Sequence, residues 1–149
     1  MNYFKHFFLI GIFALQCVSC DDIHHSSIPD YPVQLNLDLI SLYPTFINSY
    51  NKYLIFEQKK YMTDYIGYGG ILVYSGFDGN YYAFDLSCPY ESKSNIRVKP
   101  NDIGQAICDS CKTVFQIAYG NGDPMSGPAK EGLKRYRAVL NGYYLHVSN

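Results

Sequence analysis

A segment near the middle of the chain, residues 81–111, reads YYAFDLSCPYESKSNIRVKPNDIGQAICDSC and places three cysteines on two short loops. Cys88 directly follows an apolar, strand-like run and is turned by Pro89, while Cys108 and Cys111 bracket a second turn after a short strand. A C-x-x-C turn points two sulfurs and several backbone N–H groups at one centre, as thiolate sites for zinc or iron-sulfur clusters require. Two such loops separated by a strand-length segment predict that three thiols meet at one end of a β domain.

Strand patterns flank this segment on both sides. Residues 33–40, VQLNLDLI, alternate apolar and polar as a half-buried strand does, and residues 53–56 and 71–74 are further apolar runs. Asp78-Gly79 and Asn141-Gly142 are hairpin signals, because their residues tolerate positive φ. No helical period of ten or more residues is found after residue 20. We therefore expect an antiparallel all-β sandwich or small barrel that is closed by the last hairpin.

Composition limits the classes of function. With 149 residues, of which 48% are hydrophobic, the chain can build one domain with a core. The net charge of -1 and the lack of a Lys/Arg block exclude a nucleic-acid-binding surface. No Ser-His-Asp set, phosphate loop or recognisable pair of carboxylates indicates substrate turnover, so at most we expect an electron-transfer component.

The N-terminus is interpreted as a targeting segment. Residues 1–19 combine Lys5 with a short apolar run and are typical of a signal peptide. The end of this segment, with Leu15, Val18 and Ser19 before Cys20, resembles a bacterial lipobox, which predicts lipidation of Cys20. We expect residues 20–32 to be the lipidated N-terminus and a tether, and residues 33–149 to be the domain. The protein would then be an exported, membrane-anchored lipoprotein on the periplasmic or cell-surface side.

The cysteine segment and the C-terminal third together resemble the Rieske-type 2Fe-2S proteins, whose ligands follow the pattern C-x-H and C-x-x-H. This chain has C-P-Y at residues 88–90 and C-D-S-C at residues 108–111, separated by 17 residues. YYAFDLSCPYE resembles the strand that enters the first ligand loop, and CKTVFQI resembles the second loop. GDPMSGPAKEGLKRYRAVLNGYYLHV resembles the Gly-Pro loop and the final hairpin.

The resemblance implies a Rieske-like β sandwich with two cysteine-bearing loops at one end and one-electron transfer to a redox partner protein. Carried over by position, Cys88 and Cys108 match the two cysteine ligands, whereas Tyr90 and Cys111 occupy the two histidine positions. Cys111 is an acceptable iron ligand. Tyr90 is a difficult one, because its phenol must lose a proton that it holds up to a pH of about 10.

Three interpretations of the site stay open at this point. In the first, the domain carries a 2Fe-2S cluster on Cys88, Cys108 and Cys111, with Tyr90 or an outside group as the fourth ligand. In the second, no metal is bound and a disulfide clamps the two loops of a binding or structural module, as the oxidising export compartment favours. In the third, the three thiolates hold zinc, with Tyr90, a water molecule or Glu91 completing the tetrahedron.

Overall fold

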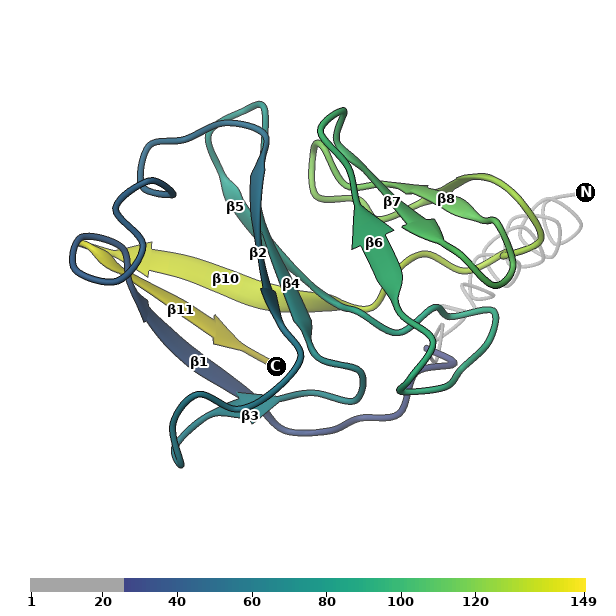
Figure 1. Ribbon diagram of the computed structural model, residues 1–149, viewed down its shortest axis with the longest axis horizontal. Helices are drawn as coiled ribbons and strands as arrows, with labels where there is room; N and C mark the ends of the chain where they lie inside the picture. Colours follow the sequence, from purple (N-terminus) through teal and green to yellow (C-terminus); the bar gives the residue numbers. More distant parts are fainter. Residues whose placement is uncertain (1–25) are drawn as a thin grey trace, which may run out of the picture.

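The computed structural model describes residues 26–149, and every regular element in this part of the chain is a β-strand (Figure 1). The predicted all-β fold is therefore confirmed. None of the described residues forms a helix with the length and hydropathy needed to cross a membrane. The strands are β1 (Val33–Asp38), β2 (Lys52–Phe56), β3 (Tyr65–Ile66), β4 (Ile71–Ser75), β5 (Tyr81–Asp85), β6 (Val98–Pro100), β7 (Gln105–Cys108), β8 (Val114–Gln116), β9 (Pro124–Ser126), β10 (Arg135–Asn141) and β11 (Tyr144–Ser148).

The strands form two antiparallel sheets. The larger sheet has seven strands in the order β2-β4-β5-β10-β11-β1-β3, and the smaller one has four in the order β6-β7-β8-β9. The whole smaller sheet is built from the chain between β5 and β10, and Figure 1 shows it beside the larger sheet. The last hairpin, β10–β11, pairs with β5 on one side and with β1 on the other, so it joins the two halves of the larger sheet.

The core has two parts that share β4. Leu72 and Tyr74 belong to a buried cluster that extends into the smaller sheet, whereas Ile71 and Val73 belong to a second cluster within the larger sheet. All five residues of β4 are buried. Because both faces of the strand are covered, its sequence is a continuous apolar run instead of an alternating one.

The local predictions agree with the structure where the pattern is strong. Along β1, buried and exposed residues alternate as expected, and the hairpin glycines Gly79 and Gly142 have φ values of 79° and 61°. The short strands β3, β6, β8 and β9 were not predicted, because two or three residues are too few to show a period. The predicted signal peptide and Cys20 lie outside the described residues.

Candidate metal centre

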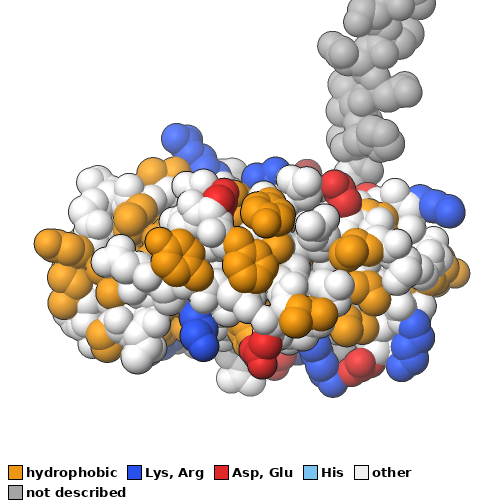
Figure 2. All heavy atoms as spheres, turned by 90° about the horizontal axis from the view of Figure 1, so that it is seen from above, with side chains coloured by type: hydrophobic (Ala, Val, Ile, Leu, Met, Phe, Trp, Pro, Cys, Tyr) orange, Lys and Arg blue, Asp and Glu red, His pale blue; other side chains and the backbone are white. Residues whose placement is uncertain are grey.

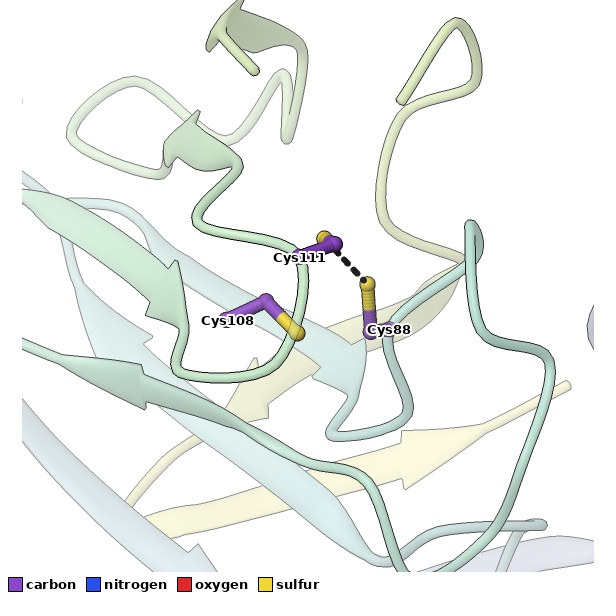
Figure 3. Close-up of side chains that lie close together, drawn as sticks. All are labelled: Cys88, Cys108 and Cys111. Atoms are coloured by element: carbon purple, nitrogen blue, oxygen red, sulfur yellow. Dashed lines mark hydrogen bonds between the residues drawn. The ribbon is translucent and has the colours of Figure 1, made fainter. Parts of the chain in front are cut away.

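Three cysteine sulfurs converge where the two loops of the middle segment meet. Cys88 lies just after β5, Cys108 is the last residue of β7, and Cys111 lies in the turn that leads to β8. Their Sγ atoms all lie within 4.8 Å of one another, and those of Cys88 and Cys111 are 3.5 Å apart. Figure 3 shows the three side chains pointing toward a common centre. Cys88 and Cys108 are fully buried, whereas Cys111 is partly exposed.

The two loops share a backbone hydrogen bond and a left-handed residue at corresponding positions. The N–H of Ser92 donates to the carbonyl of Cys88, and the N–H of Lys112 donates to the carbonyl of Cys108, each at 2.9 Å. Both donor residues have positive φ, 51° for Ser92 and 61° for Lys112. Each loop is thus a single turn with an i to i+4 hydrogen bond that ends at a left-handed residue. In this correspondence Cys88 matches Cys108, and Glu91 matches Cys111.

Hydrogen-bond donors surround the sulfurs. The backbone N–H groups of Tyr90 and Glu91 donate to Cys88 Sγ, and the side chain of Thr113 lies 3.2 Å from Cys111 Sγ. Thr113 Oγ1 also accepts a hydrogen bond from the N–H of Ala129, which leaves its own proton free to be donated to a Cys111 thiolate. Such donors stabilise the ionised form of a cysteine, which is the form that binds metals.

The pKa values of the Cys88 and Cys111 thiols are shifted in opposite directions. Burial raises the pKa of Cys88 to about 12. Burial also acts against ionisation of Cys111, but hydrogen bonds from Thr113 and from the neighbouring cysteines outweigh it and lower the pKa of that thiol. Cys111 therefore ionises before Cys88. A cation at the centre would be needed to deprotonate Cys88 at neutral pH.

The inner side of the site is apolar. Cys88 and Cys108 belong to the core cluster that links the two sheets, and Cys111 packs against it. Thiolates in such surroundings are shielded from water on the protein side, which strengthens their attraction for a cation. The other members of this cluster are Leu72, Tyr74, Phe84, Leu86, Val98, Ala106, Phe115, Ile117, Ala129 and Leu133.

The remaining candidate ligands differ in their positions. The Tyr90 side chain is 56% exposed. The carboxylate of Glu91 accepts a hydrogen bond of 2.6 Å from the hydroxyl of Ser110, so Glu91 reaches across to the second cysteine loop. Within residues 26–149 the single histidine is His146, whose Nδ1 pairs with Asn36 across β11 and β1. Among the described residues no histidine joins the three cysteines.

Asp85, three residues before Cys88, holds the base of the first loop. It is the last residue of β5, and its carboxylate is fully buried. It accepts hydrogen bonds from the N–H of Ser87 at 2.7 Å and from the hydroxyl of Tyr136 at 2.6 Å. The N–H groups of Tyr68 and Gly69 also donate to it, at 3.0 and 3.1 Å. In the sequence, the one indication of this buried role is an acidic residue at the end of an apolar strand.

Comparisons with known proteins find similar solved structures but no family. No family model matches the chain, and no curated protein matches it. Among solved structures, the chain is similar to one from the complex of reduced oxygenase and oxidised ferredoxin in carbazole 1,9a-dioxygenase. The two are 14% identical with a TM-score of 0.44, and the match covers 66% of this chain and 90% of the other.

Proposed function

We propose that this chain is an exported, lipid-anchored protein whose β domain binds one zinc ion through the thiolates of Cys88, Cys108 and Cys111. The observation that carries the proposal is the mutual separation of the three sulfurs, all within 4.8 Å. Tetrahedral zinc binds thiolates at about 2.3 Å, which places the sulfurs about 3.8 Å apart. The loops already hold the sulfurs close to this spacing, so a single ion requires little rearrangement.

Glu91 is the fourth ligand in this proposal; its carboxylate lies outside the group of three sulfurs in the structure and would have to turn toward them. Its place in the first loop corresponds to that of Cys111 in the second, and its carboxylate already lies beside the second loop through Ser110. Carboxylate oxygen is an accepted zinc ligand. The ligand order of the two loops would then be C-x-x-E and C-x-x-C.

A 2Fe-2S cluster that passes single electrons to a redox partner is the second candidate. It is favoured by the resemblance of the two loops to Rieske ligand loops and by the N–H groups directed at the sulfur of Cys88. The residues present do not fit the two-histidine cluster, because Cys111 and the exposed Tyr90 stand at the histidine positions. Sulfurs bound to different irons are also held apart by the cluster between them, whereas these three are close together.

A disulfide is the competing fate of the same sulfurs. The sulfurs of Cys88 and Cys111 are in van der Waals contact at 3.5 Å, and an oxidising compartment favours a bridge between them. Cys108 would then be left as a buried free thiol. Bound metal protects thiolates from oxidation to a disulfide. Metal content and the number of free thiols therefore both show whether the cysteines bind metal or form a bridge.

Purification without chelators of the mature lipoprotein, in which Cys17 has been removed and the sulfur of Cys20 is acylated, separates the three outcomes. A zinc protein is colourless, contains about one zinc per chain, and exposes three reactive thiols when it is unfolded in chelator. A cluster protein is brown, contains iron and inorganic sulfide, and bleaches on reduction. A Cys88–Cys111 bridge leaves one thiol and no metal. Cys108→Ser should abolish stoichiometric zinc, whereas Asn95→Ser, a change at an exposed residue outside the proposed ligands, should retain it.

Lipid anchoring is tested separately from metal binding. Cys20→Ala should release the protein from the membrane fraction and remove the acyl mass from the N-terminal peptide. The zinc content of the domain should not change, because Cys20 takes no part in the site. Membrane retention of the Cys20→Ala protein would contradict the anchoring proposal and would leave the metal proposal untouched.

A further inference from the structure

The first residues that the structure describes are packed against the cysteine end of the domain. We call residues 26–32 the strap. Ile28 in the strap is 1% exposed, and the hydroxyl of Ser27 donates a 2.8 Å hydrogen bond to the carbonyl of Pro89, the residue after Cys88. The N–H of Ser27 also donates to both carboxylate oxygens of Glu131, at 2.9 and 3.0 Å. The strap therefore touches the first cysteine loop directly.

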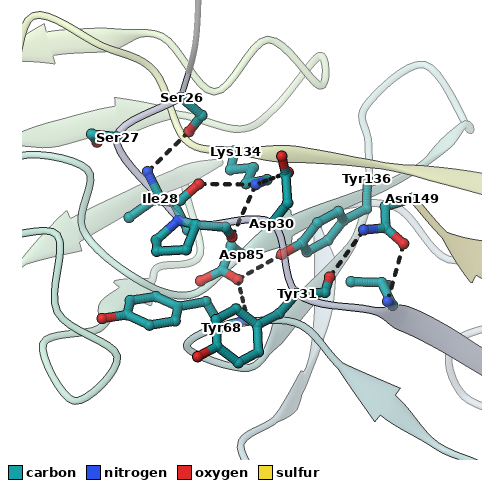
Figure 4. Close-up of polar contacts among 12 residues, drawn as sticks. Ser26, Ser27, Ile28, Asp30, Tyr31, Tyr68, Asp85, Lys134, Tyr136 and Asn149 are labelled. Carbon is teal, nitrogen blue, oxygen red and sulfur yellow. Dashed lines mark hydrogen bonds and ion pairs between the residues drawn. The ribbon is translucent and has the colours of Figure 1, made fainter.

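Lys134 holds the strap in place. Its ammonium group donates to the carbonyls of Ile28 and Pro29, at 2.9 and 3.0 Å, and pairs with the carboxylate of Asp30. The Lys134 side chain is only 11% exposed, whereas that of Asp30 is 86% exposed, so the bond to the carbonyl of Ile28 is the best shielded of the three. Figure 4 shows Lys134 reaching across the strap backbone.

The C-terminus fixes the other end of the strap. The side-chain amide of Asn149 donates to the carbonyl of Tyr31 at 2.9 Å and accepts from the N–H of Val33 at 3.1 Å. The N–H of Gly67 donates to the carbonyl of Pro32. The strap is therefore tied to the domain along its whole length, and the path from Ser26 to β1 is set by the fold.

The chain between the proposed lipid and the strap is short. Cys20 and Ser26 are six residues apart, and a fully extended chain spans at most about 3.5 Å per residue, or about 20 Å in all. A compact domain of this size is about 35 Å across. A linker shorter than the domain, attached beside one end of it, prevents the opposite end from reaching the anchoring surface.

We propose that the strap holds the cysteine loops against the lipid bilayer, so that the metal centre faces the membrane surface. This inference rests on the lipid anchoring proposed above. Tyr90 fits the role, because it is the exposed residue of the first loop and tyrosine is enriched at membrane–water interfaces. The partner of this surface is thus a bilayer, and any molecule that exchanges metal with the site would have to approach along the membrane.

The end of the smaller sheet that lies away from the cysteine loops provides a comparison position for Tyr90. Tyr119 follows β8 at the end away from the cysteine loops and is 56% exposed, the same fraction as Tyr90. Its ring packs near that of Phe77 in the β4–β5 turn. Figure 2 views the molecule from above, the side toward which this turn projects in Figure 1, and shows apolar side chains gathered on that face. In the proposed orientation this end points away from the membrane.

Tryptophan reporters test the orientation, because the chain has no tryptophan of its own. Tyr90→Trp and Tyr119→Trp are introduced singly into the full chain, and the lipidated proteins are reconstituted into phosphatidylcholine vesicles with and without a dansyl-labelled lipid. Energy transfer falls steeply with distance. We expect several-fold greater transfer from the Tyr90→Trp protein than from the Tyr119→Trp protein. For each variant, the tryptophan emission with labelled lipid is divided by the emission without it. This ratio cancels any quenching of the tryptophan by neighbouring protein groups.

A longer linker supplies the second arm. Ten Gly and Ser residues inserted after Asp22 lengthen the reach without touching the strap, and they should bring the two transfer values close together. Equal energy transfer from both reporters would contradict the proposed orientation, provided that mass spectrometry confirms the lipid. The anchoring proposal would then still stand. Absence of lipid from Cys20 overturns the anchoring and this inference together, and neither result changes the metal content.

Discussion

Replacement of Asp85 by asparagine is expected to destabilise the domain and to weaken metal binding, although the side chain touches none of the three sulfurs. Both oxygens of the buried carboxylate are used. Oδ1 accepts from the N–H groups of Gly69 and Ser87, and Oδ2 accepts from the N–H of Tyr68 and the hydroxyl of Tyr136. An asparagine amide has one oxygen, so in either orientation its NH₂ group faces at least one backbone N–H.

The magnitude follows from this geometry. One buried donor without an acceptor costs about 1–3 kcal/mol, and the bonds that survive change from the charged to the neutral class, a loss of about 1 kcal/mol each. The sum is about 3–6 kcal/mol. A typical domain has a free energy of unfolding of about 5–15 kcal/mol, so the variant should lose a large part of its stability. Because Ser87 precedes Cys88, the first cysteine loop should loosen as well.

Asp64 provides the matched control. It is also nearly buried, at 7% exposure, and it accepts from the N–H groups of Lys60 and Tyr61 at 3.1 and 2.8 Å. Both bonds go to the same oxygen, Oδ2, which the amide oxygen of asparagine can replace. Asp64→Asn leaves no buried N–H without an acceptor, so it should cost only the change of two bonds to the neutral class, about 2 kcal/mol.

The assay is urea and thermal unfolding of metal-free protein, followed by zinc titration of the folded fraction. Asp85→Asn should lower the melting temperature by about 10 °C or more, and it should reduce zinc affinity. Tyr136→Phe, which removes a single donor to Asp85, should fall between the two aspartate variants. Equal stability of the Asp85→Asn and Asp64→Asn proteins would refute the reasoning that both oxygens of Asp85 are required.

Three further outcomes are expected. Glu91→Cys should complete a four-thiolate site, visible as stronger sulfur-to-metal charge-transfer absorption in the cobalt-substituted protein, whereas an unchanged spectrum would place Glu91 outside the site. Because zinc must displace the proton of Cys88, whose pKa burial raises to about 12, apparent zinc affinity should rise at least about tenfold for each unit of pH between about 6 and 8. A titration without this slope would show that Cys88 is not a ligand. Gly69→Ala should unfold or strongly destabilise the domain in a melting experiment, because the added Cβ would lie 2.0 Å from Ser87 Oγ.

The agreement between sequence and structure is best where the information is local. Alternation along residues 33–38 and the Asn-Gly and Asp-Gly pairs depend on neighbours only a few positions away, and the structure confirms the strand and the two turns. The spacing of the cysteines also placed them at loop tips, because a strand-length segment separates the two loops. These features need no knowledge of how the sheets pack.

Long-range contacts explain what the sequence alone missed. The burial of Asp85 depends on Tyr136, which is 51 positions away on β10. The strap meets Pro89 and Lys134, 62 and 106 positions from its own residues, and no local pattern in the polar stretch before residue 33 indicates this. Contacts between residues so distant in sequence depend on how the strands pair and the sheets pack, which local patterns do not show.

The amino-acid sequence by itself determined the all-β class, the hairpins and the presence of two cysteine-bearing loops, since each follows from periodicity and turn chemistry within about ten residues. Only the tertiary structure decided that the sulfurs of Cys88 and Cys111 lie 3.5 Å apart, that Glu91 and Cys111 hold corresponding places in two matching turns, and that the strap lies on the first loop. The physical reason is that these positions are set by the pairing of strands and the packing of two sheets around one core, which local sequence patterns do not encode.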